Sequence, residues 1–111
     1  MGLLLKLLIN ALAVFGAAYI LPGVHVKNFT TALIVALVLS ILNLIVKPIL
    51  VVFTIPVTIL TLGLFLLVIN AIIVKICAHL VSGFAVDGWL YAIIFSLIVS
   101  LFSSVLESII D

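Results

Sequence analysis

Two short polar stretches, LPGVHVKNF at residues 21–29 and VSGFAVDGW at residues 81–89, interrupt an otherwise apolar chain. Each contains a Gly, an apolar residue, any residue and a Val, and each ends in an aromatic residue. Gly and Pro commonly end helices, so each stretch predicts a tight turn between two helices. We expect Pro22 and Gly23 to form the first turn and Gly83 to form the second.

The composition around these stretches is that of a membrane protein. Apolar residues make up 69% of the chain and charged residues 6%, whereas a soluble domain has about 45–50% apolar and about 25% charged residues. So few charged side chains cannot form a polar shell, and lipid must therefore solvate most of the surface. We expect one membrane domain over residues 1–111. The net charge of +1 and the lack of a Lys/Arg cluster beside a span argue against nucleic acid as a partner and give no sign of anionic-lipid binding.

The two stretches belong to a longer internal similarity. Aligning residues 1–51 with residues 61–111 without a gap gives fourteen identities in fifty-one positions. Apolar identities carry little weight in such a chain, but Ile-Asn-Ala recurs intact at 9–11 and 69–71, and glycines and serines follow in register. The sequence predicts a tandem duplication, with one repeat over 1–51 and the other over 61–111.

Each repeat contains two apolar runs that flank its polar stretch. Runs of this length form helices of about 26–29 Å, close to a hydrocarbon core of about 30 Å. We predict an all-α integral membrane protein in which the repeats are two tandem parallel helical hairpins, with both turns on one membrane face and both termini on the other. The extended segments after the two glycines are expected to pair as a two-stranded ladder. The four predicted transmembrane helices cover residues 3–21, 29–46, 63–80 and 89–105.

The linker at residues 48–62 is too apolar for an ordinary loop. Pro56 lacks an N–H and disfavours a helical conformation just before it, so a break near residues 53–55 is expected. We predict a short interfacial or re-entrant helix that begins at Pro48. Its hydroxyls are expected to bond their own helix carbonyls, in preference to lining a polar path. They belong to Thr54, Thr58 and Thr61.

Asparagine side chains occupy matching positions in the first and third spans, at Asn10 and Asn70. Unpaired polar groups in hydrocarbon cost several kcal/mol, so these amides should face protein or water. We expect them to face one another as a clamp between helices, with contact to a solute or ion as the alternative.

Polar residues also form a stripe on the second span and another on the fourth. Ser40, Asn43 and Lys47 are spaced to share one helix face. Lys47 aligns with Glu107, so an ion pair between them, within one molecule or between neighbours, is a hypothesis beside separate snorkelling to water. The aligned positions of the fourth span are Ser100, Ser103 and Glu107.

The pattern of the remaining reactive side chains does not indicate a catalytic site. Lys75 is expected to snorkel toward the headgroups, and a proton relay through Lys75 and His79 is the alternative, although the spans supply no acidic partner for it. Cys77 stands alone, which excludes an intramolecular disulfide and a thiolate metal cluster. Without a catalytic constellation, we expect no enzyme activity, no cofactor and no metal site.

Four stretches carry a resemblance to a known family. They are LLINALAVFGAAYILPGVHV at 7–26, LNLIVKPIL at 42–50, IPVTILTLGLFLLVINA at 55–71 and SGFAVDGW at 82–89. They resemble the bacterial phage holin superfamily IV family of four-span membrane proteins. The resemblance covers essentially the whole chain and implies a multi-pass protein of the bacterial inner membrane.

Three functions remain open. The first is a holin-like homo-oligomer that opens pores or lesions, and the second is a non-lytic accessory or structural protein that binds another envelope component. The third is a small channel or transporter. We expect both termini to lie in the cytoplasm, although lysines occur on both predicted faces and set no asymmetry.

Overall fold

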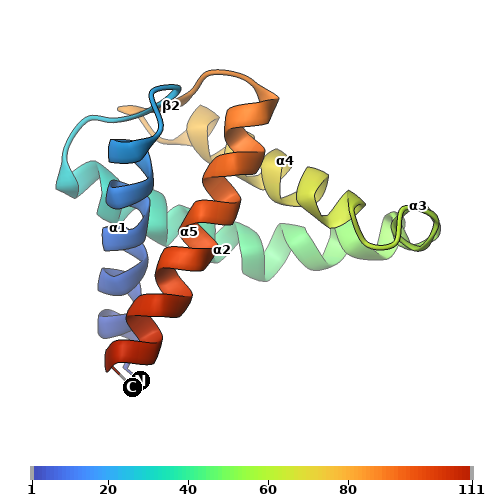
Figure 1. The fold of residues 1–111 in the computed structure, drawn as a ribbon, viewed down its shortest axis with the longest axis horizontal. Helices are drawn as coiled ribbons and strands as arrows, with labels where there is room; N and C mark the ends of the chain where they lie inside the picture. Colours follow the sequence, from blue (N-terminus) through green and yellow to red (C-terminus); the bar gives the residue numbers. More distant parts are fainter. Residues whose placement is uncertain (1, 111) are drawn as a thin grey trace.

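The computed structural model describes residues 2–110, which form an almost entirely helical chain (Figure 1). The two halves share an order of elements: a helix, a three-residue strand and a second helix. A short helix lies between the halves. The elements are α1 (Leu3–Ile20), β1 (Val24–Val26), α2 (Phe29–Phe53), α3 (Ile55–Leu60), α4 (Phe65–Leu80), β2 (Phe84–Val86) and α5 (Trp89–Ile110).

The turns after α1 and α4 follow from local sequence. Leu21 ends α1 in an extended conformation, with φ −93° and ψ 117°, as the residue before a proline prefers. In the second half, Gly83 adopts φ +87°, which a residue with a side chain rarely accepts. On the far side of the first turn, Asn28 begins α2, because its side chain accepts a hydrogen bond from the backbone N–H of Thr31 at 2.9 Å.

The two polar stretches meet in a small antiparallel ribbon, so the expected ladder is confirmed. Val24 lies opposite Val86, His25 opposite Ala85, and Val26 opposite Phe84. Just outside the strands, the N–H of Lys27 donates to the carbonyl of Gly83 at 2.9 Å, and the N–H of Asp87 donates to that of Gly23 at 2.7 Å. The two donors are sixty residues apart in the sequence, and so are the two acceptors. The two bonds are therefore equivalent under a local two-fold axis through the ribbon.

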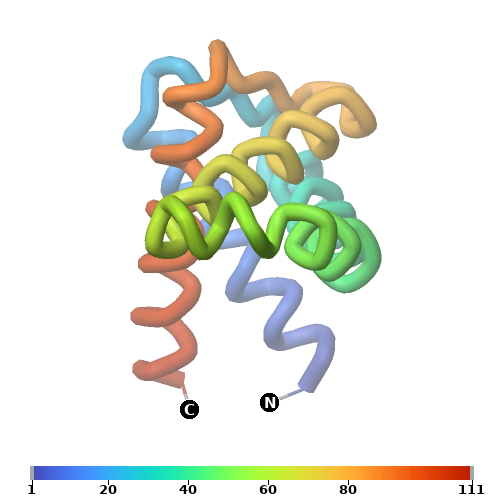
Figure 2. Tube along the Cα trace, turned by 90° about the vertical axis from the view of Figure 1, so that its right-hand side faces the viewer, coloured from blue at the N-terminus to red at the C-terminus, as the bar shows by residue number. Residues whose placement is uncertain are grey.

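The long helices pair across the two halves. α1 lies beside α5, and α2 lies beside α4. Figures 1 and 2 show that these pairs point in different directions from the ribbon, and that the first turn of α1 and the last turn of α5 share one end. The contacts predicted within each half are also present, because α1 packs against α2 and α4 packs against α5. The ribbon redirects the chain, so consecutive helices diverge after it while still packing against each other near it.

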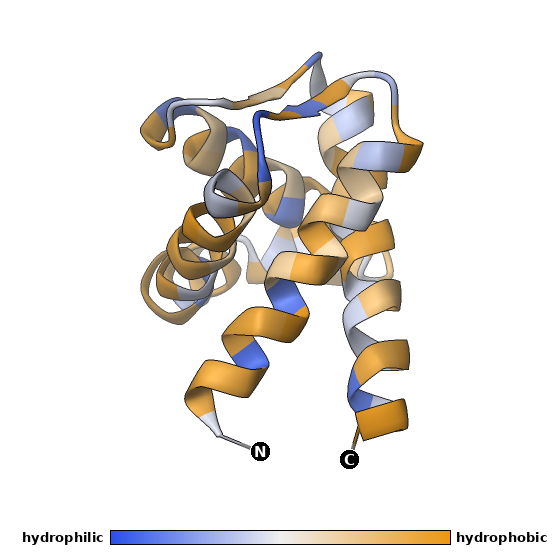
Figure 3. Ribbon diagram, turned by 90° about the vertical axis from the view of Figure 1, so that its left-hand side faces the viewer, coloured by the Kyte–Doolittle hydropathy of each residue, from blue (hydrophilic) through white to orange (hydrophobic). Residues whose placement is uncertain are grey.

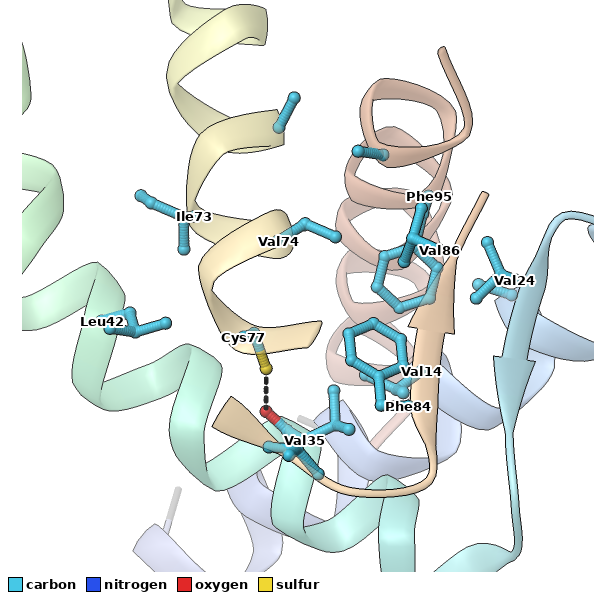
Figure 4. Close-up of a cluster of buried hydrophobic side chains, with 14 of the residues drawn as sticks. Val14, Val24, Val35, Leu42, Ile73, Val74, Cys77, Phe84, Val86 and Phe95 are labelled. Atoms are coloured by element: carbon cyan, nitrogen blue, oxygen red, sulfur yellow. Dashed lines mark hydrogen bonds between the residues drawn. The ribbon is translucent and has the colours of Figure 1, made fainter. Parts of the chain in front are cut away.

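The core lies under the ribbon, where the four long helices converge (Figure 4). The ring centroids of Phe84 and Phe95 are 5.4 Å apart, and Cys77 of α4 directs its thiol at the carbonyl of Val35 in α2, with 3.8 Å between sulfur and oxygen. The cysteine is fully buried, so it serves as a small core residue. The contact between the two rings packs β2 of the ribbon against α5.

The linker differs from its prediction. Pro48 lies inside α2, which continues to Phe53, so no helix begins at Pro48. A membrane-embedded helix tolerates an internal proline because local adjustment and hydroxyl groups re-satisfy the freed carbonyls. The interruption falls at Thr54, and Pro56 stands in the first turn of α3, a position that needs no N–H bond.

Two of the three linker hydroxyls bond carbonyls of their own helix, as expected. Thr54 donates to Leu50 at 2.7 Å, and Thr61 donates to Val57 at 3.0 Å. Thr58 has a buried hydroxyl without a partner in the part of the chain that the structure describes. The alternative, a polar path along this stripe, therefore receives no support from Thr54 or Thr61.

The outer surface of the helices is overwhelmingly apolar (Figure 3). α1, α2 and α5 are long and apolar enough to cross a membrane, and α4 is a shorter apolar helix of 16 residues. A helix of that length extends about 24 Å, less than a typical hydrocarbon core. The chain thus combines three candidate spans with one short apolar helix.

Candidate functional site

The polar side chains at membrane depth gather in one groove between the two helix pairs. The largest of three adjoining cavities, about 490 Å³, lies between α1 and α2 and is lined by Lys6, Asn10, Ser40 and Asn43 among leucines. A second, of about 110 Å³, reaches Lys47, Asn70, Ser96 and Ser100, and a third, of about 80 Å³, lies between them. We call these cavities together the polar groove.

Asn43 stands at the centre of the polar groove, because it lines all three cavities. Its side chain is exposed, and no hydrogen bond reaches it from any residue between 2 and 110. An amide in hydrocarbon without a partner costs several kcal/mol. Asn43 therefore requires water, a polar ligand or another protein group in the groove.

One direct polar contact crosses the α1/α5 pair. The hydroxyl of Ser103 donates to the side-chain oxygen of Asn10 at 2.9 Å. This corrects the expected clamp between Asn10 and Asn70: α1 packs against α2 and α5, so the partner of Asn10 is a serine of α5. In the repeat alignment, Asn70 corresponds to Asn10 and Asn43 corresponds to Ser103. These two residues, on α4 and α2, line one cavity together.

Two of the three serine hydroxyls that line the groove bond carbonyls of their own helix. Ser40 donates to the carbonyl of Ala36 at 2.8 Å, and Ser96 donates to that of Ile93 at 2.8 Å. Each hydroxyl oxygen keeps acceptor capacity. Ser40 and Ser96 can therefore accept hydrogen bonds from water in the groove, while their own O–H donors stay bonded to helix carbonyls.

The charges in the groove are all positive. Lys6 lies toward one end and Lys47 toward the other, and none of the residues lining the three cavities is an Asp or Glu. The hypothesis of an ion pair within one molecule is not met, since no salt bridge joins Lys47 to Glu107 within residues 2–110. Lys47 is on α2 and Glu107 is on α5, and these two helices do not pack extensively against each other in the described residues.

The ribbon face holds a polar contact that sequence reasoning missed. His25 and Asp87 approach to 3.0 Å across the two strands, with both side chains more than half exposed. The ladder register supplies the missing signal, because it places these residues diagonally across the ribbon.

The other side chains near the ribbon behave as surface groups. The ammonium of Lys75 lies 5.8 Å from the centroid of the Trp89 ring, and His79 is exposed. No group of three metal-binding side chains occurs among the described residues. The chemistry that the molecule presents at depth is therefore that of amides, hydroxyls and ammonium groups, suited to water and anions.

Comparison with known proteins agrees with this architecture. Residues 1–105 match the family model described as mycobacterial 4 TMS phage holin, superfamily IV. The uncharacterized membrane protein YvlD of Bacillus subtilis is 41% identical over 103 residues, covering 92% of this chain and 87% of that protein. The uncharacterized protein SCO3922 of Streptomyces coelicolor is 36% identical over 115 residues, covering 95% and 92% respectively.

No solved structure matches the fold. The family match spans nearly the whole chain, and the relatives include a bacterial membrane protein, which agrees with the apolar helices. The protein is thus a bacterial membrane protein, and it belongs to the family of mycobacterial four-span phage holins of superfamily IV.

Proposed function

We propose that the protein is a holin-like, non-enzymatic component of the bacterial cytoplasmic membrane, and that it self-associates and lines a pore or lesion with its polar groove. The observation that carries this proposal is the convergence of polar residues from all four long helices on one groove. Outside it, the helices present apolar side chains that suit lipid. A water-exposed wall is the simplest use of such a groove.

A single copy offers a blind groove. Ile73, Val74 and Phe95 line its inner cavity and are almost fully buried in the core under the ribbon. Water can enter the groove but meets apolar side chains before it reaches the ribbon face. The pore in this proposal therefore forms between copies, with each groove supplying one part of the wall.

The proposal includes the topology and origin of the fold. Both termini lie in the cytoplasm, α4 completes a fourth crossing despite its length, and the ribbon faces the other side of the membrane. The two halves arose by tandem duplication, which the paired ribbon bonds and the sixty-residue offset between equivalent elements support.

Inducible expression in a bacterium, followed with a membrane-potential dye, tests the proposal. We expect abrupt depolarisation and growth arrest with the wild type. Asn43→Leu should delay or abolish both, because it removes the central polar group of the groove. Ser104→Leu, a polar-to-apolar change on an exposed site of α5 outside the groove, is the matched control.

Healthy growth with a polarised membrane at high wild-type expression would contradict pore formation. That outcome would favour the second candidate, a non-lytic accessory protein of the envelope. This candidate is supported by the groove of a single copy, because buried apolar residues close its inner end. Selective solute flux without growth arrest would instead indicate a small channel or transporter.

A further inference from the structure

Two cavities of the polar groove are equivalent under the sixty-residue offset of the sequence, and they differ in charge. The cavity of about 80 Å³ is lined by Asn10 and Ser40, and the offset carries these residues onto Asn70 and Ser100. Both of the latter line the cavity of about 110 Å³, the inner cavity. Of these two cavities, only the inner one is lined by a charged side chain, that of Lys47.

The two cavities also differ in how their amides are bonded. In the α1/α5 pair, Ser103 donates to Asn10 at 2.9 Å, so this amide has a partner within the chain. The equivalent positions of the α2/α4 pair are Asn43 and Asn70, which both line the inner cavity. Neither forms a hydrogen bond with another residue between 2 and 110. The inner cavity therefore has hydrogen-bonding capacity that the described chain does not use, at a depth where unpaired polar groups cost free energy.

Lys47 lines the inner cavity well before the end of its helix pair. α2 continues to Phe53, about 9 Å further along the helix axis. No charged residue occurs over 48–74, and strongly exposed apolar side chains, Leu60 and Leu62 among them, cover the far end of the pair near α3 (Figure 1). A lysine that snorkelled past this end would cross apolar surface, whereas the inner cavity offers it polar partners.

The carboxylate at the position equivalent to Lys47 belongs to the other helix pair. Glu107 follows Ser103 by four residues, and Lys6 precedes Asn10 by four. Because Ser103 and Asn10 are bonded, Glu107 and Lys6 both lie one helical turn beyond that bond, at the shared end of α1 and α5. Glu107 thus has a lysine at its own end of the molecule, and none of the residues that line the inner cavity is Asp or Glu.

The size of the inner cavity limits what it can hold. Its volume of about 110 Å³ compares with about 30 Å³ per molecule in liquid water. This is room for a monatomic anion with a few waters, and too little for a phospholipid headgroup. The ammonium of Lys47, the amide N–H groups of Asn43 and Asn70, and the hydroxyl of Ser100 are donors that suit such an anion.

We propose that the inner cavity binds a small monovalent anion such as chloride, held by the ammonium of Lys47 and the amide N–H groups of Asn43 and Asn70. The anion neutralises the lysine at membrane depth and gives both amides a partner. This inference rests on the proposed function only in placing the polar groove within the bilayer. It is independent of whether copies assemble into a pore.

Thermal unfolding of the purified full chain in a nonionic detergent, followed by circular dichroism, tests the site. Midpoints are measured in sodium chloride and in sodium gluconate at equal ionic strength, because gluconate is too large for the inner cavity. At a chloride concentration ten times the Kd, the folding equilibrium constant should rise about elevenfold. Lys47→Met should lower the affinity about tenfold, through the loss of one charged hydrogen bond, and so reduce this rise to about twofold.

The other half of the chain supplies matched controls. Asn70→Leu should weaken the response to chloride at unchanged charge. Asn10→Leu alters the equivalent residue and breaks the bond with Ser103, so it should lower the midpoint in both salts but keep the chloride-dependent rise. Lys27→Met removes one positive charge from the ribbon side and should also keep the rise. Lys47→Arg keeps the cation and should retain most of the response.

Several outcomes would overturn the proposal. Equal midpoints of the wild type in chloride and gluconate exclude the site without any variant. A rise that persists unchanged in Lys47→Met and Asn70→Leu, or that is lost equally in Lys27→Met, would assign the response to a general effect of salt. A chloride-stabilised protein that leaves cells polarised keeps this site and refutes only the proposed pore, whereas a depolarising protein without a chloride response does the reverse.

Discussion

At the residue scale, the turn before β1 depends on the missing side chain of Gly23. A Cβ atom at this position would overlap the ring of Tyr91 in α5. The ring therefore packs directly over the backbone of the turn and ties the first polar stretch to the last helix.

Gly23→Ala should lower the stability of the fold by about 1–3 kcal/mol, the usual cost of overpacking a well-filled site. Thermal unfolding in detergent, followed by circular dichroism, measures the change. Gly2→Ala is the control, since a Cβ there meets no atom within 4 Å. Tyr91→Ala should reduce the penalty of Gly23→Ala, and an unchanged penalty in that background would contradict the proposed overlap.

The bond between Asn10 and Ser103 links α1 to α5 in the apolar environment of the spans. A double-mutant cycle with Asn10→Ala and Ser103→Ala should give a coupling of about 0.6 kcal/mol, and at most about 1.7 kcal/mol. The same cycle with Ser104→Ala in place of Ser103→Ala should give a coupling near zero. A coupling in both cycles would indicate that the effect is not specific to this hydrogen bond.

At the element scale, the ribbon joins segments from the two halves through facing residues His25 and Ala85. His25→Cys with Ala85→Cys, in a Cys77→Ser background, should form a disulfide under mild oxidation, because facing residues of an antiparallel pair lie within bridging distance. Mass spectrometry of the monomer fraction detects it. Tyr19→Cys with Ala85→Cys should not cross-link with comparable efficiency, and equal yields would argue against the observed register.

The sequence predicted the elements better than their packing. Gly and Pro signals at 22–23 and 83 placed the turns, and the offset between the halves led to the ladder. Pro48 misled the prediction, because intrinsic helix breaking is overridden when lipid supplies no alternative partner for the backbone. Pairing of α1 with α5 and of α2 with α4 depends on contacts between distant segments, which periodicity does not encode.

The same limit applies to the candidate site. The sequence was enough to identify the polar residues at membrane depth, because burying them in hydrocarbon costs free energy. Asn10, Ser40 and Asn43 do line the groove. Their partners were not identifiable, since an Asn–Ser contact between first and last helices carries no sequence signal.

At the scale of the whole molecule, the separation of Lys47 from Glu107 leaves open a role for these charges between copies. If they pair across an interface, Lys47→Glu and Glu107→Lys should each weaken assembly, and the double reversal should restore it. Cross-linking in lipid vesicles, resolved by electrophoresis, measures the oligomer. Equal damage from the single and double reversals would exclude such a pair.

The buried thiol of Cys77 can serve as a probe of transient opening in the core. The sulfur is fully buried and faces the carbonyl of Val35, at the place where α2 and α4 converge under the ribbon. A small, membrane-permeant alkylating reagent can reach it only when these helices separate. The alkylation rate of the unaltered chain therefore reports how often the corner opens, and comparing that rate in resting and depolarised cells would reveal whether opening of the core accompanies permeation.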